Sequence, residues 1–197
     1  MNEMWNKRYA DKRYAYGTAP NRFFKQYIEN QRAGKLLLPA EGEGRNAVYA
    51  ASIGWDVHAF DISEEGKKKA LSLARKQDVN IHYEVTNAQD FVCPADIDLI
   101  ALIYAHFDGP ARHNLFEKLI GCLNPGGYWL MEVFSKKQLG KSSGGPKTAN
   151  LLYSIEEIRR ELSNLEISLL EERVTNLDEG PYHQGPAEVL RVIARKT

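Results

Sequence analysis

Short blocks of apolar residues alternate with amphipathic segments along this chain, and each kind of block has its own period. Strand-like apolar runs lie at residues 35–39, 55–60, 80–85, 97–104 and 128–134. Helix-like segments, with apolar positions three and four residues apart, lie at residues 21–33, 45–53, 63–76 and 110–123. A regular alternation of strands and helices is typical of a parallel sheet with helices on both faces.

The last part of the chain departs from this alternation. Ser154-Ile155-Glu156-Glu157 has the pattern of a capping box and predicts the start of a helix. Two strands follow, at about 166–176 and 188–195, and a short Gly/Pro loop between them predicts that they pair as antiparallel neighbours or lie close together. Residues 97–104 are almost continuously apolar, as expected for a central strand buried on both faces. The predicted fold is a single, doubly wound α/β domain with a mostly parallel seven-stranded sheet and a C-terminal antiparallel hairpin.

A glycine-containing loop joins the first strand to its helix, and the second strand ends in an acid. Gly42 and Gly44 allow the backbone to approach a ligand closely, and Asp61 is placed to accept hydrogen bonds from a ribose. These residues predict binding of a nucleoside-containing cofactor. The spacing Gly42-x-Gly44-x-x-Ala47 also fits an NAD(P)-dependent oxidoreductase. Against that reading, the bulky Arg45 follows the loop directly, and the chain has one nucleotide-binding half rather than two.

Composition and charge narrow the range of partners. The 26 Lys and Arg residues balance the 26 Asp and Glu residues, whereas a nucleic-acid-binding protein normally has a basic excess. The N-terminus has no signal-peptide pattern, and no apolar run approaches the ~20 residues of a membrane span. Of the two cysteines, Cys93 and Cys122, the second falls at an apolar helical position that predicts a small buried residue, and a reducing compartment fits both. We expect a cytoplasmic monomer or homodimer that acts on a small molecule, with neither nucleic acid nor membrane as a partner.

Four ordered motifs resemble those of class I S-adenosylmethionine-dependent methyltransferases. These motifs are Ala40–Asn46, Asp61–Ser63, Asn87–Phe91 and Leu123–Gly127. Three further segments resemble the tellurite-resistance and thiopurine S-methyltransferase branch, namely Trp5–Asn21, Tyr104–His106 and Glu179–Gly185. The resemblance covers essentially the whole chain. It implies a Rossmann-like domain, with an N-terminal helical cover at residues 1–34 and an S-adenosylmethionine-binding core at residues 35–197.

The resemblance also implies a set of cofactor contacts. In the order of the cofactor's parts, these are Gly42 and Gly44 under the methionine and ribose, Asp61 on the ribose hydroxyls, Ile62, Asn87 and Ala88 around the adenine, Tyr104 at the methionine end, and Tyr16 and Asn21 in the cover. Two positions depart from the commonest pattern, because Ala40 replaces the first loop glycine and Pro39 stands where an acid is frequent. Glu41 is then the candidate for the contact with the methionine ammonium group.

The implied reaction needs little covalent chemistry from the protein. The sulfonium already makes the methyl group an electrophile, so the protein has to align the acceptor and exclude water. A soft acceptor such as a thiol, a selenium compound or a tellurium oxyanion needs no general base, whereas an oxygen or nitrogen acceptor more often does. His106 and His183 are the candidates to orient the substrate or act as that base, and the alternative for each is a loop histidine satisfied by local backbone.

Several alternatives stay open from the sequence. Arg45, at a helix start, either counters an anionic substrate or pairs with a glutamate, and the loop at residues 136–150 is either a lid or a tolerated surface loop. His58, His82 and His113 are assigned surface or structural positions. No cluster has metal-ligand spacing along the chain, so no metal is predicted. The alternative functions are an NAD(P)-dependent oxidoreductase and a non-catalytic protein that binds S-adenosylmethionine.

Overall fold

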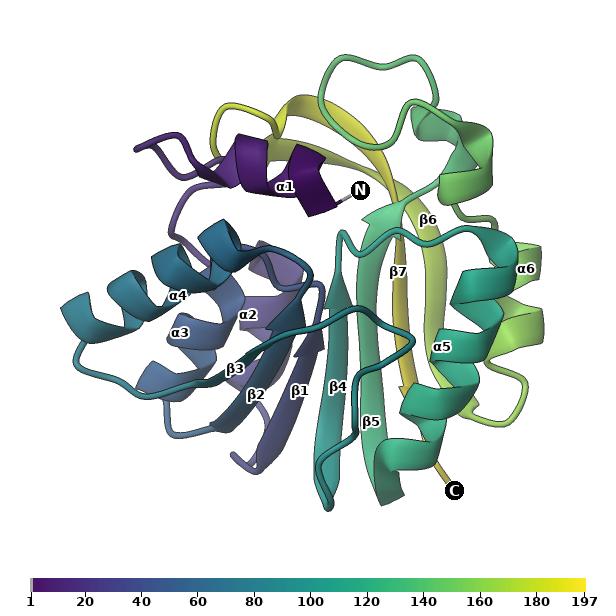
Figure 1. The fold of residues 1–197 in the computed structure, drawn as a ribbon. Coiled ribbons are helices and arrows are strands. Elements are labelled where there is room, and N and C mark those ends of the chain that lie inside the picture. The colour runs from purple at the N-terminus through teal and green to yellow at the C-terminus, as the bar shows by residue number, and fades with distance from the viewer. Residues whose placement is uncertain (1) are drawn as a thin grey trace.

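A seven-stranded mixed sheet forms the centre of the protein, in a computed structural model that describes residues 2–197 (Figure 1). The strands are β1 (Lys35–Pro39), β2 (Asp56–Asp61), β3 (His82–Val85), β4 (Ile97–Ile103), β5 (Leu123–Phe134), β6 (Glu166–Asp178) and β7 (Gln184–Arg195). Their order across the sheet is β3-β2-β1-β4-β5-β7-β6. The strand order reverses between β1 and β4, and ligands of open α/β sheets bind beyond the carboxyl ends of strands at such a point.

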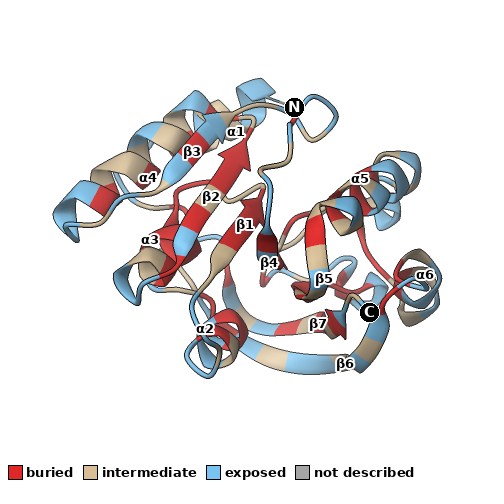
Figure 2. Cartoon of the chain, turned by 90° about the horizontal axis from the view of Figure 1, so that it is seen from below, coloured by how far each residue is buried: buried red, intermediate tan, exposed pale blue. Residues whose placement is uncertain are grey.

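Helices cover both faces of this sheet. They are α1 (Asn2–Tyr9), α2 (Arg22–Ile28), α3 (Arg45–Ser52), α4 (Glu64–Lys76), α5 (Gly109–Cys122) and α6 (Ile155–Glu161), with 3-10 turns η1 (Lys136–Gln138) and η2 (Ala149–Leu151). Helices α2, α3 and α4 pack on one face, and α5 and α6 pack on the other (Figures 1 and 2). Among residues 2–197, no helix combines the length and the apolar character needed to cross a membrane.

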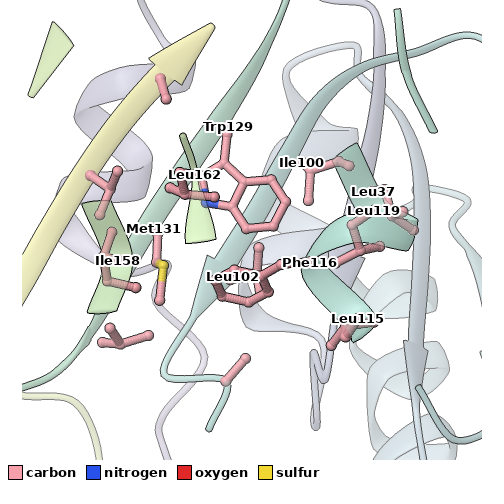
Figure 3. Packing of buried hydrophobic residues seen from close by; sticks show 14 of the residues in the cluster. Leu37, Ile100, Leu102, Leu115, Phe116, Leu119, Trp129, Met131, Ile158 and Leu162 are labelled. Carbon is pink, nitrogen blue, oxygen red and sulfur yellow. The ribbon is translucent and has the colours of Figure 1, made fainter. Parts of the chain in front are cut away.

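The core between the sheet and α5–α6 is built from large apolar side chains (Figure 3). Trp129 and Met131 of β5 pack there with Phe116 of α5 and Ile158 of α6. The rings of Trp129 and Phe116 meet edge to face, with centroids 4.9 Å apart. Burying side chains of this size contributes about 1.5–3 kcal/mol each, so this layer holds the strands rigidly below the site.

The C-terminal strands confirm the predicted hairpin. Strand β6 pairs with β7 as an antiparallel neighbour, and β7 pairs antiparallel with β5. Strand β7 therefore lies between β5 and β6, and the remaining pairs in the sheet are parallel. This arrangement places Arg191 of β7 directly opposite Glu132 of β5. The structure thus has the predicted α/β fold with a mostly parallel sheet.

The N-terminal segment differs in detail from the predicted helix at residues 21–33. Helix α2 ends at Ile28, because the chain turns after it to enter β1 at Lys35. Asn21 is the N-cap of α2, and its side-chain oxygen accepts a hydrogen bond from the Phe24 amide at 3.0 Å. The additional helix α1 lies across the carboxyl ends of the strands (Figure 1).

The two cysteines also differ from expectation. Cys93 and Cys122 are joined in a disulfide, with Cα atoms 6.0 Å apart. The loop after β3 returns across the end of α5, a proximity that a separation of 29 residues along the chain does not reveal. The prediction of Cys122 as a simple buried apolar residue, and of two reduced cysteines, is therefore wrong for this structure.

Candidate active site

The glycine loop and Asp61 lie together at the carboxyl ends of β1 and β2. Gly42 and Gly44 have φ angles of 64° and 85°, left-handed values that favour glycine. Asp61 accepts a hydrogen bond from the Gly42 amide at 3.1 Å through Oδ2 and one from the Ser63 amide at 2.9 Å through Oδ1. Burial raises the pKa of Asp61 to about 6, although these amides oppose the rise. A desolvated carboxylate at this place suits a ligand that offers hydroxyl donors and positive charge.

Two tyrosines that the sequence did not assign to the site pack on the glycine loop. The hydroxyl of Tyr83 donates to the carbonyl oxygen of Gly42 at 2.6 Å. A Cβ atom at Gly42 would lie 2.7 Å from the Tyr9 hydroxyl, so α1 closes directly over the loop. Burial, reinforced by the charge of Asp61, raises the pKa of Tyr9 well above its usual value. Tyr9 therefore presents a neutral hydroxyl beside the acid.

Glu41 caps the helix that follows the glycine loop. Its Oε1 accepts hydrogen bonds from the amides of Asn46 and Ala47, both at 2.8 Å, and its Oε2 accepts one from the Asn46 side chain at 3.2 Å. The N-cap residue Gly44 has no side chain, so Glu41 satisfies amides that α3 would otherwise leave without a partner. Burial raises the pKa of Glu41 to about 7. Its contact with a methionine ammonium group stays a prediction.

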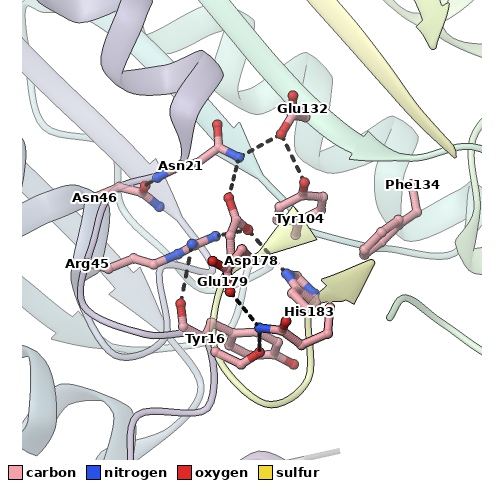
Figure 4. Close-up of polar contacts among 12 residues, drawn as sticks. Tyr16, Asn21, Arg45, Asn46, Tyr104, Glu132, Phe134, Asp178, Glu179 and His183 are labelled. Atoms are coloured by element: carbon pink, nitrogen blue, oxygen red, sulfur yellow. Dashed lines mark hydrogen bonds and ion pairs between the residues drawn. The ribbon is translucent and has the colours of Figure 1, made fainter. Parts of the chain in front are cut away.

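A buried acid on β5 joins the N-terminal segment to the centre of the sheet (Figure 4). Glu132 is 1% exposed. Its Oε1 accepts hydrogen bonds from Asn21 Nδ2 at 2.6 Å and from the Tyr104 hydroxyl at 2.9 Å, and its Oε2 accepts one from Arg191 Nε at 2.5 Å. Two predicted cofactor contacts, Asn21 and Tyr104, therefore meet on one carboxylate. A single acid within the apolar run of β5 was the signal in the sequence for this residue.

A second acid, Glu179, brings the β6–β7 loop to the start of α3. Its Oε2 accepts a hydrogen bond from Arg45 at 2.9 Å, and its Oε1 accepts one from Asn21 Nδ2 at 3.1 Å (Figure 4). Nδ1 of His183 lies 3.4 Å from Glu179 Oε2. Burial alone would raise the pKa of Glu179, but His183 and Arg45 lower it to about 2. Arg45 thus pairs with a glutamate, which was one of its two predicted alternatives.

Aromatic rings surround His183 at the ends of the central strands. The ring centroids of Tyr16, Tyr104 and Phe134 lie 4.4, 4.6 and 5.2 Å from that of His183. His183 is 5% exposed, and burial lowers its pKa although Glu179 opposes the change. The structure therefore brings Tyr16, Asn21, Tyr104 and His183 together in one place.

His106 occupies a more restrained position beside this cluster. Its Nδ1 lies 2.7 Å from the carbonyl oxygen of Leu151, and its Nε2 lies 3.5 Å from the amide nitrogen of Phe134. A carbonyl only accepts and an amide only donates, so these partners require a proton on Nδ1 and a lone pair on Nε2. Burial lowers the pKa of His106 to about 3. This geometry favours the structural alternative for His106 over that of a base.

The predicted adenine contacts lie on the loops after β2 and β3. Ile62 directly follows Asp61 and is half-buried. Asn87 Oδ1 accepts hydrogen bonds from the amides two and three residues further on, at 2.8 and 2.9 Å, and so closes a turn. Ala88 and side chains of α5 line a hollow of ≈ 260 Å³ next to this turn. No hydrogen bond between side chains of the described residues links Asn87 to the cluster around His183.

The loop at residues 136–150 is tied to the sheet. Gln138 donates to the Ser143 hydroxyl at 2.8 Å and accepts from the Glu188 amide at 2.8 Å. A Cβ atom at Gly144 would come within 2.7 Å of the His183 ring. The loop therefore packs against the cluster around His183, and its role as a lid stays a prediction.

Comparisons with protein families and solved structures match this α/β fold and its glycine loop. Residues 39–127, from the end of β1 through the turn within β5, match the family described as "Methyltransferase domain". No curated protein matches the sequence. Solved structures share the fold. One comes from work on the conversion of a disulfide bond into a thioacetal group during echinomycin biosynthesis, with 16% identity, a TM-score of 0.81 and coverage of 100% of this chain and 91% of that chain.

Two further structures extend the likeness. TehB from Haemophilus influenzae has 16% identity and a TM-score of 0.76, with 100% of this chain and 67% of that chain covered. Magnesium protoporphyrin IX methyltransferase (ChlM) from Synechocystis PCC 6803, solved with bound SAH, has 13% identity and a TM-score of 0.69, with 99% and 93% covered. Identities this low establish the fold, while the family match identifies the domain. The chain therefore has a Rossmann-like α/β fold, and its residues 39–127 match a methyltransferase domain that uses S-adenosylmethionine as the methyl donor.

Proposed function

We propose that this protein transfers a methyl group from S-adenosylmethionine to a soft atom of a small molecule, with a thiol, a selenium compound or a tellurium oxyanion as the acceptor. The observation that carries this choice is the state of the two histidines near Tyr104. Both ring nitrogens of His106 have backbone partners, and the pKa of this residue is about 3. Burial also lowers the pKa of His183. Both are weaker bases than an ordinary histidine, which favours an acceptor that ionises without help.

Asp61, Gly42 and Gly44 are proposed to hold the ribose and methionine parts of the cofactor. When bound, S-adenosylmethionine supplies a methyl group on a sulfonium, which is already electrophilic. The Asp61 carboxylate fits ribose hydroxyls because the Gly42 and Ser63 amides fix both its oxygens in place. The other proposed contacts rest on the resemblance of the sequence and are Tyr16, Asn21, Ala40, Glu41, Ile62, Asn87, Ala88 and Tyr104.

Residues 1–34 are proposed to act as a cover that keeps water from the reacting atoms. Arg8 supports this role, because its guanidinium lies over the rings of Trp5 and Tyr182, 5.0 and 4.6 Å from their centroids. It also donates to the Tyr16 hydroxyl at 2.8 Å. These contacts fasten α1 to the β6–β7 loop above the site. Excluding water in this way strengthens the polar interactions inside and protects the methyl donor.

The likeness to TehB extends over the whole of this chain and shows a shared fold, so the tellurite-resistance branch rests on the sequence motifs. The acceptor itself needs a direct test. We would titrate the protein with S-adenosylmethionine, S-adenosylhomocysteine and NADH by calorimetry, and then measure S-adenosylhomocysteine formation with thiols, selenite, tellurite, phenols and amines. Turnover with the soft acceptors is expected. Turnover with phenols or amines alone would refute the proposed acceptor class, binding without turnover would indicate a non-catalytic protein, and binding of NADH alone would indicate an oxidoreductase.

His183→Gln provides a second, sharper test. A general base typically accelerates a reaction about 10²–10⁴-fold, so losing one lowers kcat by a similar factor. We expect kcat for a thiol acceptor to fall less than tenfold in this variant, and the pH profile to follow ionisation of the thiol. A larger fall in kcat, with loss of the dependence on the acceptor's own pKa, would show that His183 acts as a base.

A further inference from the structure

The far end of strand β2 carries a second group of chemically active side chains. Asp56 and His58 lie two residues apart on β2 and so point to the same face of the sheet. His82 on β3 is the register partner of His58. Parallel pairing places register partners side by side on one face, so the two imidazoles and the carboxylate converge although they are distant in the sequence.

The three side chains approach each other closely. Asp56 Oδ1 lies 3.5 Å from His58 Nε2 and 3.9 Å from His82 Nε2. The two rings are stacked, with centroids 4.6 Å apart and planes 17° apart. One ligand atom from each residue lies within 4.8 Å of the other two. Both distances to Asp56 Oδ1 exceed the usual 2.7–3.2 Å of a hydrogen bond, so the atoms face one another across a small gap.

This gap has the size of a coordinated metal ion. Zinc binds imidazole nitrogen at about 2.0–2.1 Å and carboxylate oxygen at about 2.0–2.2 Å, which in a tetrahedron separates the ligand atoms by about 3.4 Å. His58 and Asp56 already have this separation. His82 needs a shift of about half an ångström to reach this separation from Asp56. Its side chain is 74% exposed, so no neighbouring core residue has to move.

We propose that Asp56, His58 and His82 bind a late first-row divalent ion, of which Zn²⁺ is the one we would test. Two imidazoles and one carboxylate suit Zn²⁺, Ni²⁺ or Cu²⁺ rather than Ca²⁺ or Mg²⁺, which prefer oxygen ligands. Lys35, the register partner of Asp56, donates its ammonium to the Ala95 carbonyl at 2.9 Å and is held there. Three protein ligands leave a fourth position for water.

This site is separate from the proposed methyl transfer. Asp56 and Asp61 are the first and last residues of β2, and five steps along a strand of about 3.3 Å each place them roughly 16 Å apart. The ion would therefore join β2 to β3 without touching the reacting atoms. Within residues 2–197, strand β3 is a four-residue edge strand that pairs with β2 alone. Binding is expected to raise the melting temperature and to leave methyl transfer unchanged.

The test uses the tag-free full chain, treated with EDTA and then dialysed, without reductant so that the cysteine pair does not compete for metal. Calorimetry with Zn²⁺ alone is expected to show one ion per chain. His82→Gln should weaken binding at least tenfold and abolish the rise in melting temperature. His113→Gln is the matched control, because His113 is an exposed histidine that faces Glu117 at 3.6 Å, outside the cluster, and it should bind as the unmodified chain does.

Equal Zn²⁺ affinity in the unmodified chain and His82→Gln would overturn the proposal, as would a loss confined to His113→Gln. Asp56→Asn provides an independent test, because this exposed side chain can be changed without disturbing the core. Asp56→Asn should also weaken Zn²⁺ binding. Unchanged Zn²⁺ affinity in this variant would show that the Asp56 carboxylate is not a ligand. Circular dichroism of each variant confirms that the chain is folded. None of these results depends on the methyltransferase activity.

Discussion

Replacing Asp61 by asparagine tests whether the buried carboxylate is the ribose contact. The side chain is 7% exposed, and its folded pKa of about 6 lies above the ordinary value of 3.8. The folded state therefore holds a proton that the unfolded state releases between these two values. Stability from this group is fully present below pH 3.8 and is lost as the pH rises through about 6.

The size of the effect follows from the shift. A rise of roughly two pKa units corresponds to about 3 kcal/mol that the ionised carboxylate costs the ligand-free fold at pH 8. Asparagine removes this cost, but its one amide oxygen cannot accept from both the Gly42 and Ser63 amides, which costs about 1–2 kcal/mol. Ligand-free Asp61→Asn should therefore be as stable as the unmodified chain at pH 8, or slightly more stable. It should gain nothing at pH 4.

Affinity for the cofactor should change in the opposite direction. Hydrogen bonds to a charged group contribute about 1.5–3 kcal/mol each, so losing the carboxylate is expected to weaken S-adenosylmethionine binding about 100-fold. Urea unfolding at pH 4 and pH 8 measures stability, and calorimetry at pH 8 measures affinity. Asp78→Asn is the matched control, because Asp78 is exposed and has a φ of 53°, a conformation that asparagine tolerates. Unchanged cofactor affinity in Asp61→Asn would refute the proposed role.

Three other substitutions, one of them with a matched control, test the framework around the site by urea unfolding. Arg45→Gln leaves Glu179 buried without its arginine partner and should cost about 3 kcal/mol. The control Lys137→Gln breaks an exposed pair with Glu172 and should cost far less, and equal costs would contradict the interpretation of the buried network. Leu102→Ala removes a fully buried side chain and should cost about 2–5 kcal/mol, and a loss below about 1 kcal/mol would mean that the core collapses into the space. Ser154→Ala removes the capping box of α6 and should cost about 1 kcal/mol, with no effect expected on cofactor binding.

The elements of the fold could be predicted because each has a local cause. Apolar runs, N-cap residues and the short Gly/Pro loop all act over a few neighbouring positions, and the structure has strands and helices close to the expected places. The positions of the glycine loop and Asp61 could also be predicted, because one strand–helix–strand unit fixes their spacing along the chain. The early end of α2 was missed, because the turn into β1 decides it and the apolar period does not.

The partners within the site could not be predicted, because they come from distant parts of the chain. Asn21 and Glu132 are 111 residues apart, and Arg45 and Glu179 are 134 residues apart. The first contact depends on the packing of α2 against β5, and the second depends on the placement of the β6–β7 loop beside α3, neither of which the sequence determines. The convergence of His58 and His82 has the same origin, since register between strands sets it. Spacing along the chain reveals metal ligands only when one turn or helix supplies them.

The position of the family match explains why the sequence predicts the methyl donor but does not predict the acceptor. Residues 39–127 contain the glycine loop, Asp61 and the turn at Asn87, which are the proposed contacts of the cofactor's nucleoside. Most of the surroundings of His183 come from outside that range, because Tyr16, Phe134 and the β6–β7 loop supply them, and Tyr104 is the ring that comes from within it. Under the proposed function, the matched segment is expected to bind the methyl donor, and the segments on either side of it are expected to shape the acceptor site. Exchanging acceptor preference by mutation should accordingly require changes around His183 at positions that are not proposed cofactor contacts, such as Phe134, and these changes should leave the affinity for S-adenosylmethionine intact.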